Sequence, residues 1–112
     1  AAGDAKGARA RACYLALNSN SAMCKLKLSD YEVCIRLCDS VLALDEGNAK
    51  VCYRKGLALR ELGRAGEAET VLKKALELDP ADVGIQKLLA DMAKQKRREQ
   101  DAEKRLAQKM FG

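Results

Sequence analysis

Apolar residues recur three and four residues apart along most of the chain, with charged and polar residues between them. This spacing is typical of amphipathic helices. The predicted helices span residues 9–28, 30–46, 49–62, 65–78 and 82–112. Residues 1–8 are small and polar and include two glycines, so we expect a linker or a disordered end there. Sustained alternation of β-branched residues is missing, which argues against sheets and predicts an all-α fold.

Turn and capping residues separate the predicted helices. Ser29 and Glu32 match a capping box at the start of the second helix. Gly47 fits a left-handed C-cap at the end of that helix. Asp79 is expected to cap the fifth helix, with Pro80 at its first position, where a missing N–H has no consequence.

The helical pattern repeats with a period of 34 residues, in two units that begin at Leu15 and Ala49. Small residues stand at positions 8 and 20 of each unit, and the residues at positions 24 and 27 fill the space behind them. At these four positions the units carry Ala22, Cys34, Cys38 and Val41, and then Gly56, Ala68, Leu72 and Ala75. Because small residues let helices cross closely, we predict two helical hairpins within residues 9–81.

The predicted last helix has two parts of different character. Its first part carries an apolar stripe that can cover the second hairpin, formed by Ile85, Leu88, Leu89 and Met92. In residues 94–105, nine of the twelve residues are charged, which leaves no face for a core. We therefore expect the helix to project into solvent beyond about residue 93. A small apolar group ends it, consisting of Leu106, Met110 and Phe111.

Composition narrows the possible partners. The net charge of +5 suits an acidic partner, and no apolar run reaches membrane-spanning length. The chain has no His and no Cys-x-x-Cys, which argues against a zinc site, and we expect no cofactor. The five cysteines are expected to be small buried hydrophobes of a reduced protein, in the cytoplasm or also in the nucleus. No activated nucleophile or phosphate-binding loop suggests catalysis.

A 34-residue helix-turn-helix unit with these small residues resembles the tetratricopeptide repeat. The resemblance implies a superhelix in which the first helix of each hairpin lines a concave face through positions 2, 5, 6, 9 and 13. The residues so placed are Ala16, Ser19, Asn20, Met23, Lys27, Lys50, Tyr53, Arg54 and Leu57, followed by Lys87 and Asp91 of the last helix. Lys25, Glu46 and Lys55 depart from the family pattern. This basic surface suits a carboxylate-rich peptide, because charge-assisted hydrogen bonds to carboxylates are strong.

The resemblance extends to one binding site of this family. Tetratricopeptide co-chaperones hold the C-terminal Glu-Glu-Val-Asp of the 90-kDa and 70-kDa heat-shock chaperones in a carboxylate clamp. The family's clamp positions hold Asn20, Lys50 and Arg54 in this chain. The resemblance implies a supporting groove of Met23, Lys27, Tyr53, Leu57 and Lys87. The family's first repeat supplies a further Lys and Asn to the clamp. Only about eight residues precede the first predicted helix here, so we expect this chain to be a fragment that lacks that repeat.

Two segments, 20–28 and 50–56, are similar to the C-terminal halves of the large FKBP-type immunophilins. Tetratricopeptide cyclophilins are the close alternative. In both groups a peptidyl-prolyl cis-trans isomerase (rotamase) domain precedes the repeats, so the resemblance implies a catalytic domain upstream of this non-enzymatic chain. The family's basic C-terminal helix is also associated with calmodulin.

Other hypotheses stay open at this point. The chain could be a general tetratricopeptide scaffold for an unrelated acidic peptide. Its basic last helix could bind calmodulin, and the Tyr14–Leu17 face could support self-association. A nucleic-acid contact ranks lowest, because the basic segment has no interleaved aromatic residues and its six cations are offset by three carboxylates.

Overall fold

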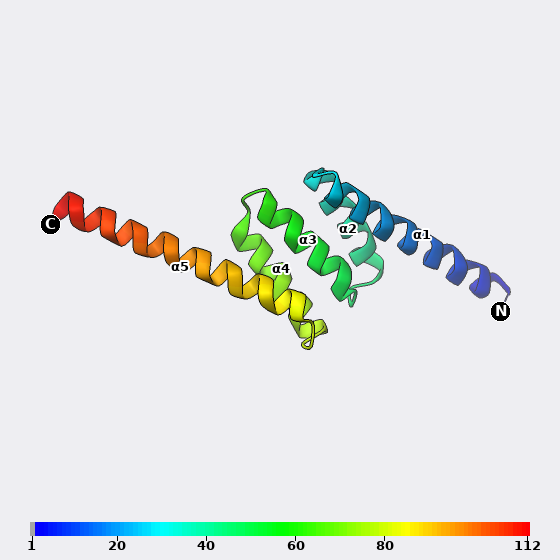
Figure 1. Ribbon diagram of the computed structural model, residues 1–112. Helices are drawn as coiled ribbons and strands as arrows, with labels where there is room; N and C mark the ends of the chain where they lie inside the picture. Colours follow the sequence, from blue (N-terminus) through cyan, green and yellow to red (C-terminus); the bar gives the residue numbers. More distant parts are fainter. Residues whose placement is uncertain (1) are drawn as a thin grey trace.

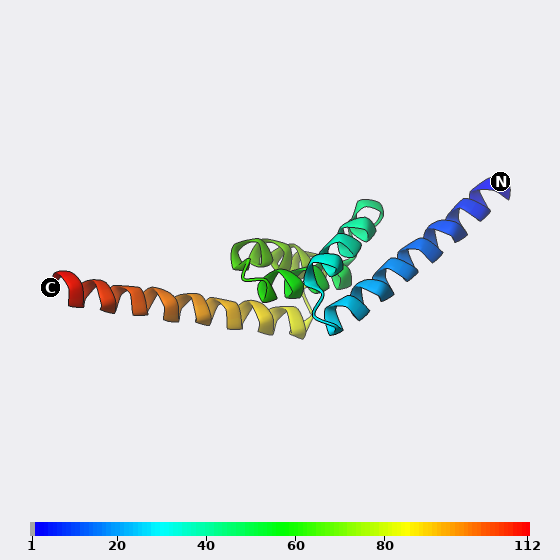
Figure 2. The same cartoon turned by 90° about the horizontal axis from the view of Figure 1, so that it is seen from above.

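A computed structural model describes residues 2–112 as five helices joined by short turns (Figure 1). The helices are α1 (Ala2–Lys27), α2 (Tyr31–Leu44), α3 (Ala49–Glu61), α4 (Ala65–Leu78) and α5 (Val83–Phe111). The described residues contain no strand, so the predicted all-α class is confirmed. Helices α1 to α4 form two neighbouring hairpins, and the molecule measures 74 × 28 × 19 Å. The free ends of α1 and α5 extend in opposite directions (Figure 2).

Small residues bring the two helices of each hairpin together, as the 34-residue pattern predicts. In the first hairpin Ala22 of α1 and Cys38 of α2 are fully buried. In the second, Gly56 of α3 faces the buried Leu72 of α4, and a Cβ added at Gly56 would lie 2.5 Å from Leu72 Cδ2. The side chain of Leu72 therefore fills the space beside Gly56, and only glycine fits there unless Leu72 shifts.

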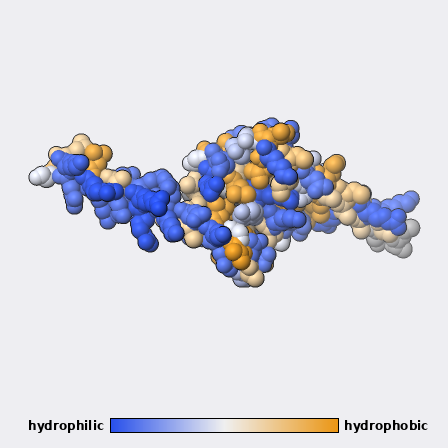
Figure 3. Space-filling model, in the orientation of Figure 1, coloured by the Kyte–Doolittle hydropathy of each residue, from blue (hydrophilic) through white to orange (hydrophobic). Residues whose placement is uncertain are grey.

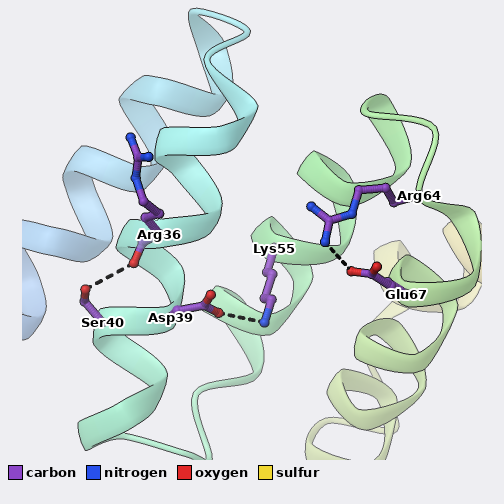
Figure 4. A network of polar contacts seen from close by, with 6 residues as sticks. All are labelled: Arg36, Asp39, Ser40, Lys55, Arg64 and Glu67. Atoms are coloured by element: carbon purple, nitrogen blue, oxygen red, sulfur yellow. Dashed lines mark hydrogen bonds and ion pairs between the residues drawn. The ribbon is translucent and has the colours of Figure 1, made fainter.

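Apolar side chains of successive helices form a continuous core. One cluster joins α1, α2, α3 and α4 and includes Val41, Val51 and Leu59. A second cluster, with Cys52, Ala75 and Ile85, attaches the beginning of α5 to the second hairpin. Polar contacts add to this packing at the surface. Lys55 Nζ of α3 lies 2.6 Å from Asp39 Oδ1 of α2 (Figure 4). This lysine, which departs from the repeat pattern, thus has an ion-pair partner in the preceding helix.

The turn inside each hairpin is closed by one residue with positive φ. These residues are Ser29, at 62°, and Gly63, at 77°. Ser29 N donates to Leu26 O at 3.1 Å, and Asp30 N donates to Lys25 O at 2.9 Å. The corresponding bonds around Gly63 are 3.0 and 2.9 Å long. This is a Schellman motif in both hairpins. The predicted capping box is therefore wrong, because Ser29 ends α1, and Asp30 is the N-cap of α2 without a side-chain bond.

The turn between hairpins also recurs after 34 residues. Asp45 ends α2 at φ −140°, ψ 75°, and Asp79 ends α4 at φ −140°, ψ 79°. Asn48 Oδ1 then accepts from Val51 N at 3.1 Å, and Asp82 Oδ1 accepts from Ile85 N at 3.1 Å. Two predictions are wrong here. Gly47 is not among the described residues with positive φ, and Asp82, not Asp79, caps α5.

The first helix is longer than expected, because it begins at Ala2 and not near Arg9. Of the predicted linker 1–8, residues 2–8 are thus helical, and residue 1 lies outside the described part. Alanines favour the helix strongly enough to offset the unfavourable propensity of two glycines. Just after this extension, Arg11 Nη2 donates to Leu44 O at 2.6 Å, so α1 contacts the C-terminal end of α2.

Helix α5 leaves the second hairpin after its first three turns. Ile85 and Leu88 are buried, whereas every residue from Ala93 onward is exposed. The exposed part is largely hydrophilic and carries an apolar tip (Figure 3). The side chains of Leu106, Met110 and Phe111 are exposed there. Neither this helix nor any other in the described part of the chain is long and apolar enough to cross a membrane.

Candidate functional site

The two candidate cations lie one turn apart on α3. Asn48 caps this helix through the N–H of Val51, which fixes its beginning at Ala49. Lys50 therefore lies in the first turn and is exposed, whereas Arg54 lies one turn later and is 7% exposed. The sequence pattern predicts two equivalent cations in a groove, but the structure gives them different surroundings.

Arg54 connects α3 to α1. Its Nη1 donates to the carbonyl oxygen of Ser19 at 3.0 Å and to Ser19 Oγ at 2.7 Å. Its Nε is buried and has no hydrogen-bond partner among the described residues. The guanidinium is thus held by two neutral oxygens of one residue, and part of its hydrogen-bonding capacity is unused.

Asn20 directly follows Ser19 on α1 and is exposed. Through its bond to Ser19, Arg54 contacts the residue that directly precedes Asn20, although Arg54 and Asn20 are far apart in the sequence. Asn20 and Arg54 are also equivalent in the repeat, since they are separated by 34 residues. One position of the unit thus supplies an exposed amide and, in the next unit, a buried cation.

The supporting residues differ in exposure. Met23, Tyr53 and Leu57 are half-buried, and Lys27 and Lys87 are exposed. Tyr53 reaches the beginning of α5, since its hydroxyl oxygen lies 3.7 Å from where a Cβ of Gly84 would be. This contact places the first turn of α5 beside α3. The binding roles of these five residues stay a prediction.

The sequence pattern includes Ser19 among the lining residues but gives no indication that it holds Arg54. The usable signal is a Ser at position 5 of one unit and an Arg at position 6 of the next. Nor does the helical period indicate that Arg54 is buried, because α1 covers it and belongs to the preceding unit.

The cysteines do not form a reactive group. Burial raises the pKa of the Cys34 and Cys52 thiols, and burial together with the neighbouring Cys34 raises the pKa of Cys38 to about 12. These three thiols stay protonated near neutral pH and serve as packing residues. The expectation of burial is wrong for Cys13 and Cys24, which are exposed on α1. No cluster of three or more potential metal ligands occurs within residues 2–112.

A separate groove lies where α5 leaves the body, with a volume of about 550 Å³. Ala65, Gly66 and Met92 give it apolar surface, and its charged lining residues carry both signs. It contains none of the candidate clamp residues, and its mixed charges do not select an acidic ligand.

Comparison with known proteins supports the repeat assignment. The family model described as "Tetratricopeptide repeat" matches residues 49–82, which comprise α3, α4 and the turn before α5. Over 81 residues, or 72% of this chain and 15% of the relative, the chain is 40% identical to Outer envelope protein 61 of Arabidopsis thaliana. Over 96 residues, or 86% of this chain and 28% of the relative, it is 33% identical to human FK506-binding protein-like. The chain thus spans less than a third of either relative.

Solved structures give the same result for the fold. The Hsp90 co-chaperone Cns1 of Saccharomyces cerevisiae superposes with a TM-score of 0.83 and 25% identity, over 89% of this chain and 32% of that one. The second TPR domain of human RPAP3, solved in complex with the HSP70 peptide SGPTIEEVD, superposes with a TM-score of 0.68 and 28% identity. That alignment covers 80% of this chain and 83% of the RPAP3 domain. The chain is a tetratricopeptide-repeat domain, and FK506-binding protein-like is among its homologues.

Proposed function

We propose that the concave face formed by α1, α3 and the beginning of α5 binds the acidic C-terminal tail of a 90-kDa or 70-kDa heat-shock chaperone. Lys50 and Arg54 would contact the carboxylates or carbonyls of the tail, and Asn20 would bind its terminal carboxylate. Met23, Lys27, Tyr53, Leu57 and Lys87 would form the surrounding groove. The module would thereby attach a longer co-chaperone to its chaperone.

One observation carries this proposal: the α1–α3 contact holds the buried Arg54 against Ser19, the residue before Asn20, while Lys50 is exposed one turn away. A buried cation with neutral partners attracts an anion more strongly than a fully solvated one, because less water screens the charge. The RPAP3 complex, whose peptide ends in Glu-Glu-Val-Asp, supports the class of ligand.

The direct test titrates the chain with the peptide SGPTIEEVD and measures binding by fluorescence anisotropy or calorimetry. Lys50→Ala should weaken binding about tenfold or more, because it removes one charge-assisted contact without disturbing a buried side chain. Lys74→Ala is the matched control, since Lys74 is an exposed lysine of α4 and its loss changes the net charge equally. Arg54→Ala should also lose binding.

Equal weakening by Lys50→Ala and Lys74→Ala would show that only the overall charge matters. Peptide affinity that persists in both Lys50→Ala and Arg54→Ala would exclude the clamp. If the wild-type chain binds an unrelated acidic peptide as tightly as SGPTIEEVD, a general tetratricopeptide scaffold would be favoured.

The proposal extends to the longer protein. Similarity to FK506-binding protein-like supports a parent that carries a peptidyl-prolyl isomerase domain. Its location in the cytoplasm or nucleus stays a prediction. Calmodulin binding by the basic part of α5 and self-association stay predictions without support from the described geometry.

A further inference from the structure

The unusual feature of the candidate site is the confinement of Arg54. The side chain is more than nine-tenths buried, and Nη1 donates to both oxygens of Ser19. Nε is buried without a partner. Of the three guanidinium nitrogens, one is therefore fully occupied and another cannot reach solvent. Nη2 is the nitrogen left to contact a ligand.

This arrangement leaves the positive charge without a counterion. Within the described part of the chain, the ion pairs join other residues, among them Lys55–Asp39 and Lys73–Glu69. The two oxygens that Arg54 contacts are neutral. Breaking the hydrogen bonds of this guanidinium costs more free energy than moving an exposed arginine, because few alternative partners exist in a buried site.

We propose that Ser19 is a positioning residue of the peptide site, which fixes the guanidinium of Arg54 so that Nη2 meets a ligand carboxylate. This inference rests on the proposed function. Ser19 would not itself contact the peptide. Its hydroxyl and carbonyl together would determine the orientation of the guanidinium plane, and through it the location of the carboxylate between α1 and α3.

The chemistry of Ser19 suits this role. A serine hydroxyl accepts one bond while it keeps a donor for another partner, and its small side chain leaves room for a guanidinium between two helices. Threonine preserves the hydroxyl, whereas alanine removes it and leaves Nη1 with the carbonyl alone. Because the guanidinium is planar and rigid, two bonds from Nη1 also fix the direction of Nη2, which the single nitrogen of a lysine could not provide.

The test compares Ser19→Ala, Ser19→Thr and a Ser19→Ala/Arg54→Ala double variant in a titration with SGPTIEEVD. Ser19→Ala should weaken peptide binding about three- to tenfold, since one charge-assisted bond that orients Arg54 is lost. Ser19→Thr should retain most of the affinity. The double variant should bind no more weakly than Arg54→Ala alone, because Ser19 acts only through Arg54. Ser21→Ala, on the same helix, is the matched control and should bind like the wild type.

A second readout concerns the free chain. The Nε–H resonance of Arg54 should be protected from solvent exchange in the wild type and lose this protection in Ser19→Ala. Wild-type binding that Ser19→Ala leaves unchanged would overturn this inference and leave the proposed function intact. Additive losses in the double variant would also overturn it. Failure of the wild type to bind the peptide would overturn the proposed function together with this inference.

Discussion

The α1–α2 and α3–α4 hairpins share one backbone arrangement but carry different residue pairs at positions 8 and 24 of the repeat. In the first hairpin these positions hold Ala22 and Cys38, both fully buried, and in the second they hold Gly56, which faces Leu72. The first pair is of two small residues, and the second combines the smallest residue with a large one. A close crossing thus depends on the sum of the two side chains and not on either residue alone.

The same comparison explains which features are shared and which are individual. The intra-hairpin turn uses positive φ in both hairpins, at Ser29 and at Gly63. The turn after each hairpin is closed by an Asp with almost identical dihedral angles and is followed by a capping residue. Individual chemistry appears at the concave positions, where the exposed Asn20 corresponds to the buried Arg54. The framework is therefore repeated, and the site differs from unit to unit.

Exchanging the crossing pair should give the largest change in stability. Gly56→Ala alone should destabilise the chain by about 1–3 kcal/mol, because the new Cβ overlaps the fully buried side chain of Leu72, which would have to shift within a packed core. Leu72→Cys alone should cost about 2 kcal/mol through the space it empties. The double variant recreates the Ala22–Cys38 pair and should lose clearly less than the sum. Urea unfolding measures all three.

Gly66→Ala provides the control for this exchange. A Cβ at Gly66 meets nothing within 4 Å, so this variant should gain about 0.5 kcal/mol from reduced flexibility of the unfolded chain. Strictly additive effects of Gly56→Ala and Leu72→Cys would show that the two residues do not share one packing site.

Exchanging the turn residues should have a smaller effect. Ser29 adopts a φ of 62° that glycine accepts more readily, so Ser29→Gly should stabilise the chain by up to about 1 kcal/mol. Gly63→Ala should destabilise it by about the same amount for the same reason. Gly47→Ala is the control, because a Cβ there meets nothing and the residue lacks a positive φ. Thermal melting compares them, and a lower melting temperature of Ser29→Gly would contradict the account.

The turn between hairpins allows a still smaller gain. Glu46 is equivalent to Pro80, and the preceding Asp45 and Asp79 have nearly the same dihedral angles. Glu46→Pro should therefore stabilise the chain by about 0.4–1 kcal/mol by restricting the unfolded state. Pro80→Ala should lose a similar amount. A destabilised Glu46→Pro variant in urea unfolding would show that the two turns differ at this residue.

The hairpins should also differ at alkaline pH, although not near neutrality. The first hairpin buries Cys34 and Cys38 where the second has Ala68 and Leu72. Burial raises the pKa of Cys38 from 9.0 to about 12 in the folded chain. Between these values the unfolded chain loses the proton first, so the free energy of unfolding should fall as pH rises.

Urea unfolding on both sides of pH 9.0 tests this dependence. Cys38→Ala should flatten it, whereas Cys13→Ala, which removes an exposed thiol, should leave it unchanged. Since all other side chains are the same, the difference between the wild type and Cys38→Ala reports the Cys38 thiol together with its effect on the neighbouring Cys34. Equal slopes for the wild type and Cys38→Ala would contradict the buried-thiol account.

Much of the fold could be predicted because packing positions repeat. The residues at positions 8, 20, 24 and 27 of both units are buried as the 34-residue period requires. Helix ends are harder to predict from the sequence. Ser29, for example, is compatible with an N-cap and with the left-handed end of a preceding helix. The local pattern does not decide between these roles, and the contact between α1 and α2 does.

The candidate site could be predicted only in part, for a related reason. The period places Lys50 and Arg54 on one face of α3, but it does not show which of them a neighbouring helix covers. Arg54 is buried where it contacts Ser19 of α1, which precedes it by 35 residues. Such a contact between units depends on the angle between α1 and α3, which no single-helix pattern contains.

The proposed clamp should recognise the free C-terminal carboxylate of an acidic peptide. The most direct measurement titrates the chain with SGPTIEEVD and with the same peptide ending in a C-terminal amide. The account predicts that the amide binds about tenfold or more weakly, and that Asn20→Ala removes most of this difference by weakening only the free acid. Equal affinity of the wild-type chain for the acid and the amide would contradict it.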